Sequence, residues 1–270
     1  MADVVLLEVA DRIATVTLNR PAARNAMSAE LIALLGRLVE IADGRDDVDV
    51  LILTGADPAF CAGLDLKELG HDGGVLKRPP GTSRTTTADP TDVPRRRARG
   101  ITLPTAKPII GAVNGVAVTG GLELALNCDF LVASDRARFA DTHSRVGVHP
   151  LWGLTVLLPQ AVGIRRAREM SATGNYIDAR RALDWGLVNH VVDHDELLPF
   201  TRTLAADIVS SDQRAVGAVL ATYEEVSGVP GAEARDVETR AASVFQRGGV
   251  DPADIERRRR GVVDRGRSQV

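Results

Sequence analysis

The chain contains 270 residues, of which 44% are hydrophobic and 26% are charged, and its formal net charge is −3. A chain of this size and composition buries a substantial apolar core, which excludes an intrinsically disordered, collagen-like or coiled-coil protein. The small negative charge gives no general attraction for nucleic acid or an anionic membrane, and 3% aromatic residues offer few surfaces for stacking bases. We therefore expect neither nucleic acid nor a membrane as a partner.

The cysteine content and the hydropathy pattern favour a cytoplasmic protein. Cys61 and Cys128 are too few for a disulfide framework or for a four-ligand metal site, so we expect no metal. No apolar run approaches the roughly 18 to 20 residues of a membrane helix. Asp3 and Glu8 stand where a signal peptide requires an apolar centre.

The first expected elements are a β-hairpin and an amphipathic helix. Apolar residues alternate over residues 4–9 and 13–18, which indicates two strands at the edge of a sheet. Ser28 has the side chain of a helix N-cap, and Gly44 is of a type that commonly ends a helix. The apolar positions between them, spaced by three or four residues, are Leu31, Leu34, Leu35, Leu38 and Ile41.

The remainder of the chain indicates an α/β fold. Three short, wholly apolar runs predict strands that are covered on both faces, and helical patterns lie between them. After about residue 152 the pattern becomes helical, apart from residues 188–192. The three apolar runs are 50–53, 108–113 and 130–133, and the last predicted helix covers 251–267.

Residues 70–100 interrupt this organisation. They are rich in Gly, Pro, Thr and Arg, and they contain seven basic residues against three acidic ones. A segment of this length without apolar periodicity is either a flexible lid over a site or a disordered insertion.

Two segments combine a strand end, a glycine-bearing turn and the start of a helix. Residues 51–69 contain Gly63 at this place, and in residues 108–126 Gly120 opens a helix that carries Glu123 in its first turn. Backbone N–H groups at such corners are available to an anion or a developing oxyanion. However, glycines near helix starts often serve close packing, and a first-turn glutamate often caps its helix. Spacing alone leaves both roles open.

Four blocks then follow one another in a distinctive order. They are NRPAARNAMS (19–28), AFCAGLDLKEL (59–69), KPIIGAVNGVAVTGGLELALNCDFLVAS (107–134) and ARFADTHSRVGVHP (137–150). Together they make the chain resemble the enoyl-CoA hydratase/isomerase, or crotonase, family. The likeness covers about residues 1–195 and is looser in the helices beyond. Four ordered blocks are far more specific than a single glycine pattern.

The resemblance implies a fold, a substrate class and an assembly. The implied fold is a superhelix of repeated ββα units over residues 1–195, followed by a helical region, residues 196–270, that builds homotrimers or hexamers. Such proteins act on acyl-CoA thioesters, commonly in fatty acid metabolism. Coenzyme A is then part of the substrate, and no separate cofactor is expected.

The resemblance also implies specific site residues. Two backbone N–H groups hold the thioester oxygen as it becomes an enolate, and by position these belong to Ala62 and Gly120. Preorganised amides stabilise an oxyanion by on the order of 3 to 4 kcal/mol per donor. The residues that we expect to contact the CoA moiety are Arg24, Ala62, Leu64, Asp65 and Lys67.

Proton transfer in family hydratases uses two glutamates, one to activate water and one to help deliver a proton to the α carbon. Glu123 matches the first, whereas His143 stands at the second position. An imidazole of ordinary pKa, near 6.5, can act as an acid or a base at neutral pH. His143 is equally consistent with local structural bonding, in which Asp141 either orients the ring or caps the next turn.

The expected reaction is therefore hydration of a 2-enoyl-CoA. A double-bond isomerase and an acyl-CoA-binding protein without turnover are the alternatives. Trp152 stands where the family often has a small glycine-rich segment, so it either reshapes the acyl pocket or packs in the core. Leu151 takes the place of the aspartate nucleophile of family dehalogenases, and we do not expect that reaction.

Overall fold

The computed structural model describes residues 3–65, 67–68, 103–247 and 258. By its contacts the chain divides into two compact units, and among the described residues the first unit ends at Gly217. Helix α9 (Gln213–Val226) begins in the first unit and continues into the second, which also contains α10 (Gly231–Arg247). The predicted lid at 70–100 lies outside the described residues, as does the predicted helix at 251–267 except for Arg258.

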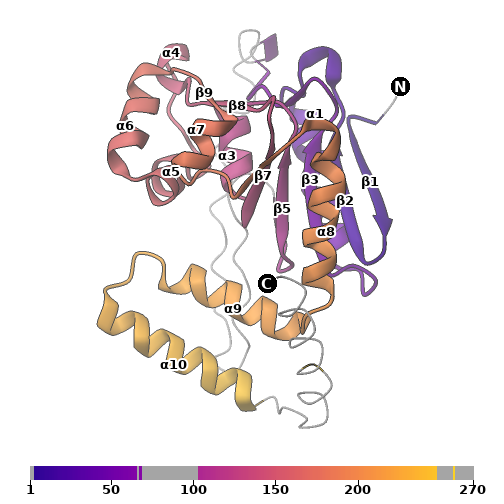
Figure 1. Cartoon of the computed structure of the whole chain (residues 1–270), viewed down its shortest axis with the longest axis vertical. Helices are drawn as coiled ribbons and strands as arrows, with labels where there is room; N and C mark the ends of the chain where they lie inside the picture. Colours follow the sequence, from indigo (N-terminus) through magenta and orange to yellow (C-terminus); the bar gives the residue numbers. More distant parts are fainter. Residues whose placement is uncertain (1–2, 66, 69–102, 248–257, 259–270) are drawn as a thin grey trace. The chain divides into compact units, whose positions relative to one another are not determined.

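The first unit contains two sheets (Figure 1). The larger has the strand order β1-β2-β3-β5-β7-β10, in which β1 is antiparallel to β2 and the other pairs are parallel. The smaller has the order β4-β6-β8-β9, with only its last pair antiparallel. The strands are β1 (Val5–Ala10), β2 (Ile13–Leu18), β3 (Val50–Gly55), β4 (Ala59–Cys61), β5 (Ile109–Val113), β6 (Val116–Val118), β7 (Phe130–Ser134), β8 (Arg138–Ala140), β9 (Ile177–Asp178) and β10 (His190–Val192).

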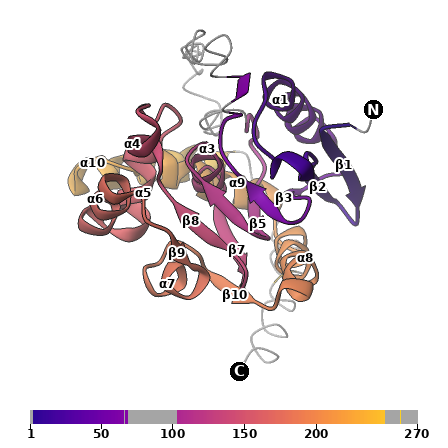
Figure 2. The ribbon, with the colours of Figure 1, turned by 90° about the horizontal axis from the view of Figure 1, so that it is seen from above.

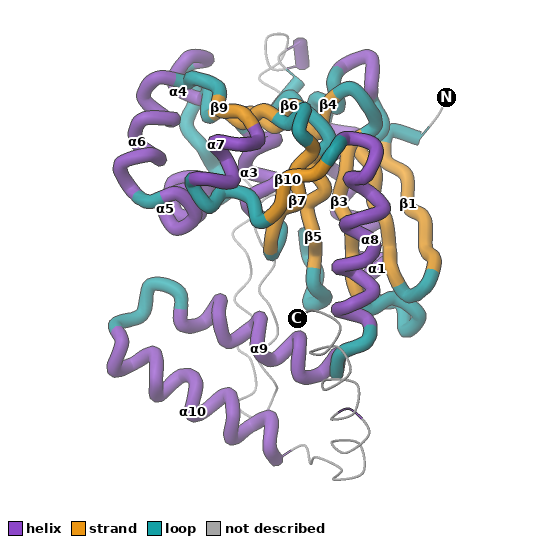
Figure 3. Tube along the Cα trace, in the orientation of Figure 1, coloured by secondary structure: helices purple, strands orange, loops and turns teal. Residues whose placement is uncertain are grey.

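Helices cover both faces of the larger sheet and also gather beside the smaller sheet. Figure 2 shows α1 and α8 on opposite sides of the larger sheet, and Figure 3 shows α4 to α7 grouped at the end of the unit away from β1. The helices of this unit are α1 (Ala29–Asp43), α3 (Gly120–Leu126), α4 (His143–Val146), α5 (Leu154–Val162), α6 (Ile164–Thr173), α7 (Ala179–Asp184) and α8 (Leu197–Val209), with short 3-10 turns at η1 (Pro21–Ala23) and η3 (His194–Glu196).

The predicted edge hairpin is confirmed. Strands β1 and β2 pair in antiparallel register from Val5 opposite Leu18 to Ala10 opposite Ile13, and β1 ends the sheet. Asp11 and Arg12 form the turn with φ angles of 51° and 64°. The Arg12 guanidinium donates to both carboxylate oxygens of Asp49, and these bonds tie the turn to the residue before β3.

The predicted first helix is also confirmed, with one difference in its apolar face. The Ser28 hydroxyl accepts a bond of 3.1 Å from the Leu31 N–H and caps the helix. The fully buried positions are Leu31, Leu35, Val39 and Ala42, whereas Ile41 is 46% exposed. Ile41 is two residues after Val39, a rotation of about 200° around the helix, so it points away from the core.

The wholly apolar strands are covered on both faces, as predicted. Leu51 and Leu53 of β3 belong to the main core, which α1 covers, and their neighbours Val50 and Ile52 belong to a second cluster with Leu197 and other residues of α8. Alternate side chains of a strand point to opposite faces, so an apolar residue is required at every position.

Two parts of the organisation differ from the prediction. Strands β4, β6 and β8 have three residues each, which is too short for a period of two to be visible in the sequence. Helix α8 lies on the larger sheet against β3 and β5, so the first compact unit runs to Gly217 and not to the predicted boundary at residue 195.

The packing of α3 against β4 gives a testable prediction. A Cβ atom on Gly121 would lie 2.1 Å from the Cys61 carbonyl oxygen, so Gly121→Ala forces the helix and strand apart. We expect the free energy of unfolding to fall by about 1 to 3 kcal/mol in urea denaturation. The control is Gly217→Ala, where nothing lies within 4 Å of the added carbon. There the helical alanine is expected to stabilise by up to about 1 kcal/mol. Equal effects at the two glycines would contradict the packing argument.

Candidate active site

The two glycine-bearing corners lie side by side. Parallel pairing of β4 with β6 brings the ends of these strands together. Gly63 follows β4 with φ of +89°, and a Cβ atom built on it would lie 3.0 Å from the Val118 carbonyl oxygen and 3.5 Å from the Gly120 nitrogen. A side chain at position 63 would therefore separate the corners, and glycine permits both the close approach and the backbone angle.

The assignment of Ala62 as an amide donor was wrong. The Ala62 N–H donates to the Arg24 carbonyl oxygen at 3.0 Å, so it is already engaged. Two residues later, Leu64 forms a parallel bridge with Met27. In this bridge the Met27 N–H donates to the Gly63 carbonyl oxygen, and the Asp65 N–H donates to the Met27 carbonyl oxygen. In such a bridge the central residue directs its own N–H to the opposite side. At this corner the available amide belongs to Leu64, which lines the adjoining cavity.

The Gly120 amide at the other corner is also available. Gly120 is the first residue of α3, so its N–H has no carbonyl partner within the helix. The preceding Thr119 does not cap the helix with its side chain, because its hydroxyl makes a short hydrogen bond to the Thr142 hydroxyl. This bond leaves the amides of the first turn uncovered.

A cavity adjoins these corners. Its empty volume is about 570 Å³, part of it open to solvent. Its wall combines apolar side chains with a few polar groups, which is typical of a small-molecule site. The lining residues are Ala62, Leu64, Thr119, Glu123, Thr142, His143, Val146, Val148, His149, Leu151 and Trp152.

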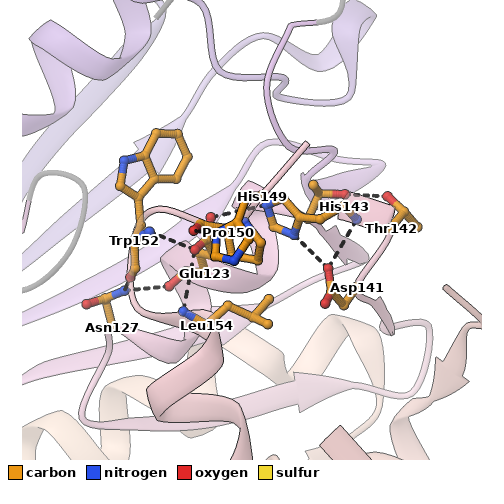
Figure 4. A network of polar contacts seen from close by, with 10 residues as sticks. Glu123, Asn127, Asp141, Thr142, His143, His149, Pro150, Trp152 and Leu154 are labelled. Carbon is orange, nitrogen blue, oxygen red and sulfur yellow. Dashed lines mark hydrogen bonds and ion pairs between the residues drawn. The ribbon is translucent and has the colours of Figure 1, made fainter. Parts of the chain in front are cut away.

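Glu123 is buried at one wall of this cavity, with 1% of its surface exposed. Its Oε1 atom accepts hydrogen bonds from the N–H groups of Trp152, at 2.8 Å, and Leu154, at 3.4 Å (Figure 4). The Asn127 amide bridges the Glu123 and Trp152 carbonyl oxygens at 2.7 and 2.9 Å. These bonds fix the carboxylate, and its second oxygen lies 3.4 Å from His143 Nε2.

His143 lies between two carboxylates. Its Nε2 atom faces Glu123, and its Nδ1 atom lies 2.6 Å from Asp141 Oδ1. Burial lowers the pKa of the imidazole, but the hydrogen bonds to Asp141 and Glu123 outweigh burial and raise the pKa to about 9. Burial likewise raises the pKa of Asp141, yet bonds from His143 and Ser171 hold that pKa below its usual value. The two carboxylates therefore favour the protonated imidazolium form of His143, which can donate a proton.

Only some of the residues predicted to contact CoA line the cavity. Ala62 and Leu64 line the cavity, whereas the Arg24 and Lys67 side chains are exposed. Arg24 is joined to the first corner through its carbonyl bond with Ala62. The Asp65 carboxylate binds Arg20, which follows β2, at 3.0 Å and accepts a bond from the Lys67 N–H, so it is occupied by partners within the protein.

Trp152 packs in the core, as one of the two interpretations predicts, and its place on the cavity wall leaves the other, a role in the acyl pocket, as a prediction. It is buried, with 5% of its surface exposed, and it belongs to the main core while lining the cavity. A Cβ atom on Gly120 would lie 2.8 Å from the six-membered ring of the indole. The indole therefore packs directly against one of the two corners and forms the cavity wall there.

Several contributors were not expected from the sequence. Leu64 was assigned to CoA contacts and not to the amide pair, and the main-chain donors at Trp152 and Leu154 leave no mark in residue types. For Asn127 the sequence does carry a signal, because this polar residue stands four positions after Glu123 and therefore lies on the same helix face, where it is buried. Among the described residues there is no group of three His, Cys, Asp or Glu side chains that could hold a metal ion, and no helix long and apolar enough to span a membrane.

Several known proteins are similar to this chain in sequence and in fold. A family model described as enoyl-CoA hydratase/isomerase matches residues 8–248. The probable enoyl-CoA hydratase 1, peroxisomal, of Arabidopsis thaliana is 40% identical over 201 residues, which cover 74% of this chain and 71% of that protein. The 1,2-epoxyphenylacetyl-CoA isomerase of Escherichia coli is 34% identical over 219 residues, 81% of each chain. The crystal structure of an enoyl-CoA hydratase from Mycobacterium tuberculosis H37Rv has 48% identity and a TM-score of 0.71, over 90% of this chain and 98% of that one.

The raised pKa of His143 predicts a pH-dependent contribution to stability. The folded-state pKa of about 9 exceeds the unfolded value of 6.5, so protonation favours the folded state. The contribution is fully present below pH 6.5 and is lost as the pH rises through 9. We expect the difference in free energy of unfolding between wild type and His143→Gln to shrink across this range in denaturant titrations. A difference that stays constant with pH would contradict the assigned charge.

Proposed function

Because the chain belongs to the enoyl-CoA hydratase/isomerase family, we propose that it catalyses the reversible addition of water to the double bond of a 2-enoyl-CoA thioester. The observation that carries this proposal is the buried pair of Glu123 and His143, with 3.4 Å between Oε2 and Nε2, on the wall of a cavity beside two available amides. A base, an acid and an oxyanion site are the groups that this reaction requires.

The amides of Leu64 and Gly120 bind the thioester oxygen. Glu123 removes a proton from water as the oxygen of that water bonds to C3 of the acyl chain. The π electrons of the double bond move toward the carbonyl, and the resulting enolate oxygen is stabilised by the two N–H groups. His143 then donates its Nε2 proton to C2, and the thioester carbonyl re-forms. One water molecule has been added across the double bond.

The contact between the two side chains also closes the cycle. After the reaction Glu123 is protonated and His143 is neutral. Because Oε2 and Nε2 are 3.4 Å apart, the proton returns from the carboxyl group to the imidazole without a distant relay. The pair is then restored to carboxylate and imidazolium.

The charge of His143 favours hydration over isomerisation. Isomerisation moves one proton between two carbons and requires a single base at this site. At neutral pH His143 is held as an acid, since its pKa is about 9, and Glu123 lies beside it as a separate carboxylate. A base and an acid side by side match the addition of water, in which one proton is removed from water and another is delivered to C2.

The proposal also covers the CoA contacts of the protein, its compartment and its assembly. Coenzyme A enters as part of the substrate, the chemistry requires no separate cofactor, and Arg24 and Lys67 meet the CoA phosphates. Cys61 and Cys128 are both buried, and so low a cysteine content is consistent with the cytoplasm. We propose a homotrimer or hexamer that acts in fatty acid metabolism, because the family resemblance implies this assembly and setting.

Substitution of Glu123 tests the reaction directly. Glu123→Gln keeps the shape and the acceptor for the Trp152 amide but removes the base, so we expect kcat for 2-enoyl-CoA hydration to fall by about 10²- to 10⁴-fold. The assay follows loss of the conjugated thioester absorbance and confirms the hydroxyacyl product by mass spectrometry. Glu8→Gln, an exposed change on β1, is the matched control and should retain full activity.

The same assay separates the alternatives. A 3-enoyl-CoA that becomes conjugated faster than a 2-enoyl-CoA is hydrated would establish the isomerase. Saturable binding of acyl-CoA in calorimetry without turnover of either substrate would establish a binding protein. Either result overturns the hydratase proposal.

Trp152 predicts the acyl-chain preference. Because its indole forms the wall beside Gly120, Trp152→Leu opens space where further methylene groups of the substrate can be buried. Each additional buried methylene contributes about 0.8 kcal/mol, roughly fourfold in kcat/KM. We expect the ratio of kcat/KM for ten-carbon over four-carbon enoyl-CoA to rise at least tenfold. Trp185→Leu, at a tryptophan that does not line the cavity, is the control, and an equal change in both variants would show that the indole does not set the preference.

A further inference from the structure

Asp141 is a buried carboxylate with an unusual set of partners. Its exposed fraction is 1%, and it stands immediately after β8. One of its oxygens, Oδ1, lies 2.6 Å from His143 Nδ1 and 3.1 Å from the His143 backbone nitrogen. A third bond comes from the side chain of Ser171 on α6, which packs against α4.

We propose that Asp141 is a positioning residue that holds the His143 imidazole by Nδ1, so that Nε2 carries its proton toward Glu123 and the cavity at the start of each catalytic cycle. This inference rests on the proposed hydration reaction. It identifies what makes a histidine effective at the position where family hydratases have a glutamate.

The bonds to Asp141 fix the orientation of the ring and keep the proton on Nδ1. Because one oxygen accepts from the Nδ1–H and from the backbone N–H of the same residue, rotation of the ring would break the shorter bond. A proton on Nδ1 alone would leave Nε2 as a lone pair, which cannot donate to the substrate. The second proton is stabilised by Glu123, 3.4 Å from Nε2.

Among the residues that the structure describes, the charged groups that act on the ring are two carboxylates. Glu123 faces it from α3 and Asp141 from the segment after β8, while α6 contributes the neutral hydroxyl of Ser171 to Asp141. On α4 itself, Arg145 donates to the Thr173 carbonyl oxygen at 2.7 Å. The nearby His149 directs Nδ1 toward the Pro150 carbonyl oxygen, at 2.7 Å. Among the described residues, the two carboxylates therefore set the charge on His143.

A purely structural role for Asp141 makes different predictions. The bond to the His143 backbone N–H would also serve a turn that only starts α4. In that case replacement of Asp141 would change stability, while the ionisation of His143 and the pH dependence of turnover would stay as they are. The test must therefore measure the imidazole and not activity alone.

The variant Asp141→Asn separates these roles. Its side-chain oxygen still accepts from Nδ1 and the backbone, but the negative charge is lost. We expect KM within about twofold of wild type and kcat lowered by about 10- to 100-fold, less than the roughly 10²- to 10⁴-fold contributed by an acid or base itself. We also expect the alkaline limb of the kcat profile to move at least one pH unit lower. Asp195→Asn, an exposed change with the same loss of charge, should leave all three unchanged.

Nitrogen-15 NMR of the imidazole gives the decisive measurement without turnover. In the wild type we expect Nδ1 of His143 to be protonated and the ring to titrate near 9, with a lower midpoint in Asp141→Asn. An unchanged midpoint in the variant, or an unprotonated Nδ1 in the wild type, overturns the inference. If the variant does not fold, the wild-type spectrum still decides. A wild type that fails to hydrate enoyl-CoA while its imidazole titrates as expected would refute the proposed function and not this arrangement.

Discussion

Glu123 holds its carboxylate at the wall of the cavity with only 1% of its surface exposed, and the surrounding structure is arranged to hold it there. A buried carboxylate is costly unless hydrogen bonds and an opposite charge replace its hydration. Here two main-chain N–H groups, from Trp152 and Leu154, bind one oxygen, and the His143 imidazolium faces the other. The same partners that make burial tolerable also fix the orientation of the carboxylate.

This requirement joins segments that are distant in the sequence. Helix α3 begins where β6 ends, α4 begins after β8, and the donors at 152 and 154 belong to the start of α5 and the residues before it. Strands β6 and β8 are neighbours in the smaller sheet, so their registry determines the distance between Glu123 and His143. The short sheet therefore matters more to the chemistry than its size suggests, while the larger sheet supplies the rigid core beneath it.

The sequence predicted features that depend on local pattern. The hairpin, the cap at Ser28, the apolar strands and the place of Glu123 in a first helical turn each follow from residue types at fixed spacing. Strands of three residues carry no readable period, so the smaller sheet was missed. The confusion of Ala62 with Leu64 has a similar cause, because the direction of an N–H depends on which neighbour pairs with Met27, and side chains do not encode it. The ionisation of His143 depends on Asp141 and on Glu123, twenty residues earlier, and only the folded geometry reveals it.

The amides assigned to the thioester oxygen are main-chain atoms, and this separates two properties that are usually coupled in an enzyme. The Leu64 side chain and the Trp152 indole line the cavity, yet in the proposed reaction neither side chain supplies an atom that polarises the carbonyl. Substitutions at these two positions would therefore change the shape of the cavity and leave the main-chain donors in place. The thioester carbonyl would still be polarised in such variants, because the N–H groups that polarise it belong to the main chain and do not depend on the side chains.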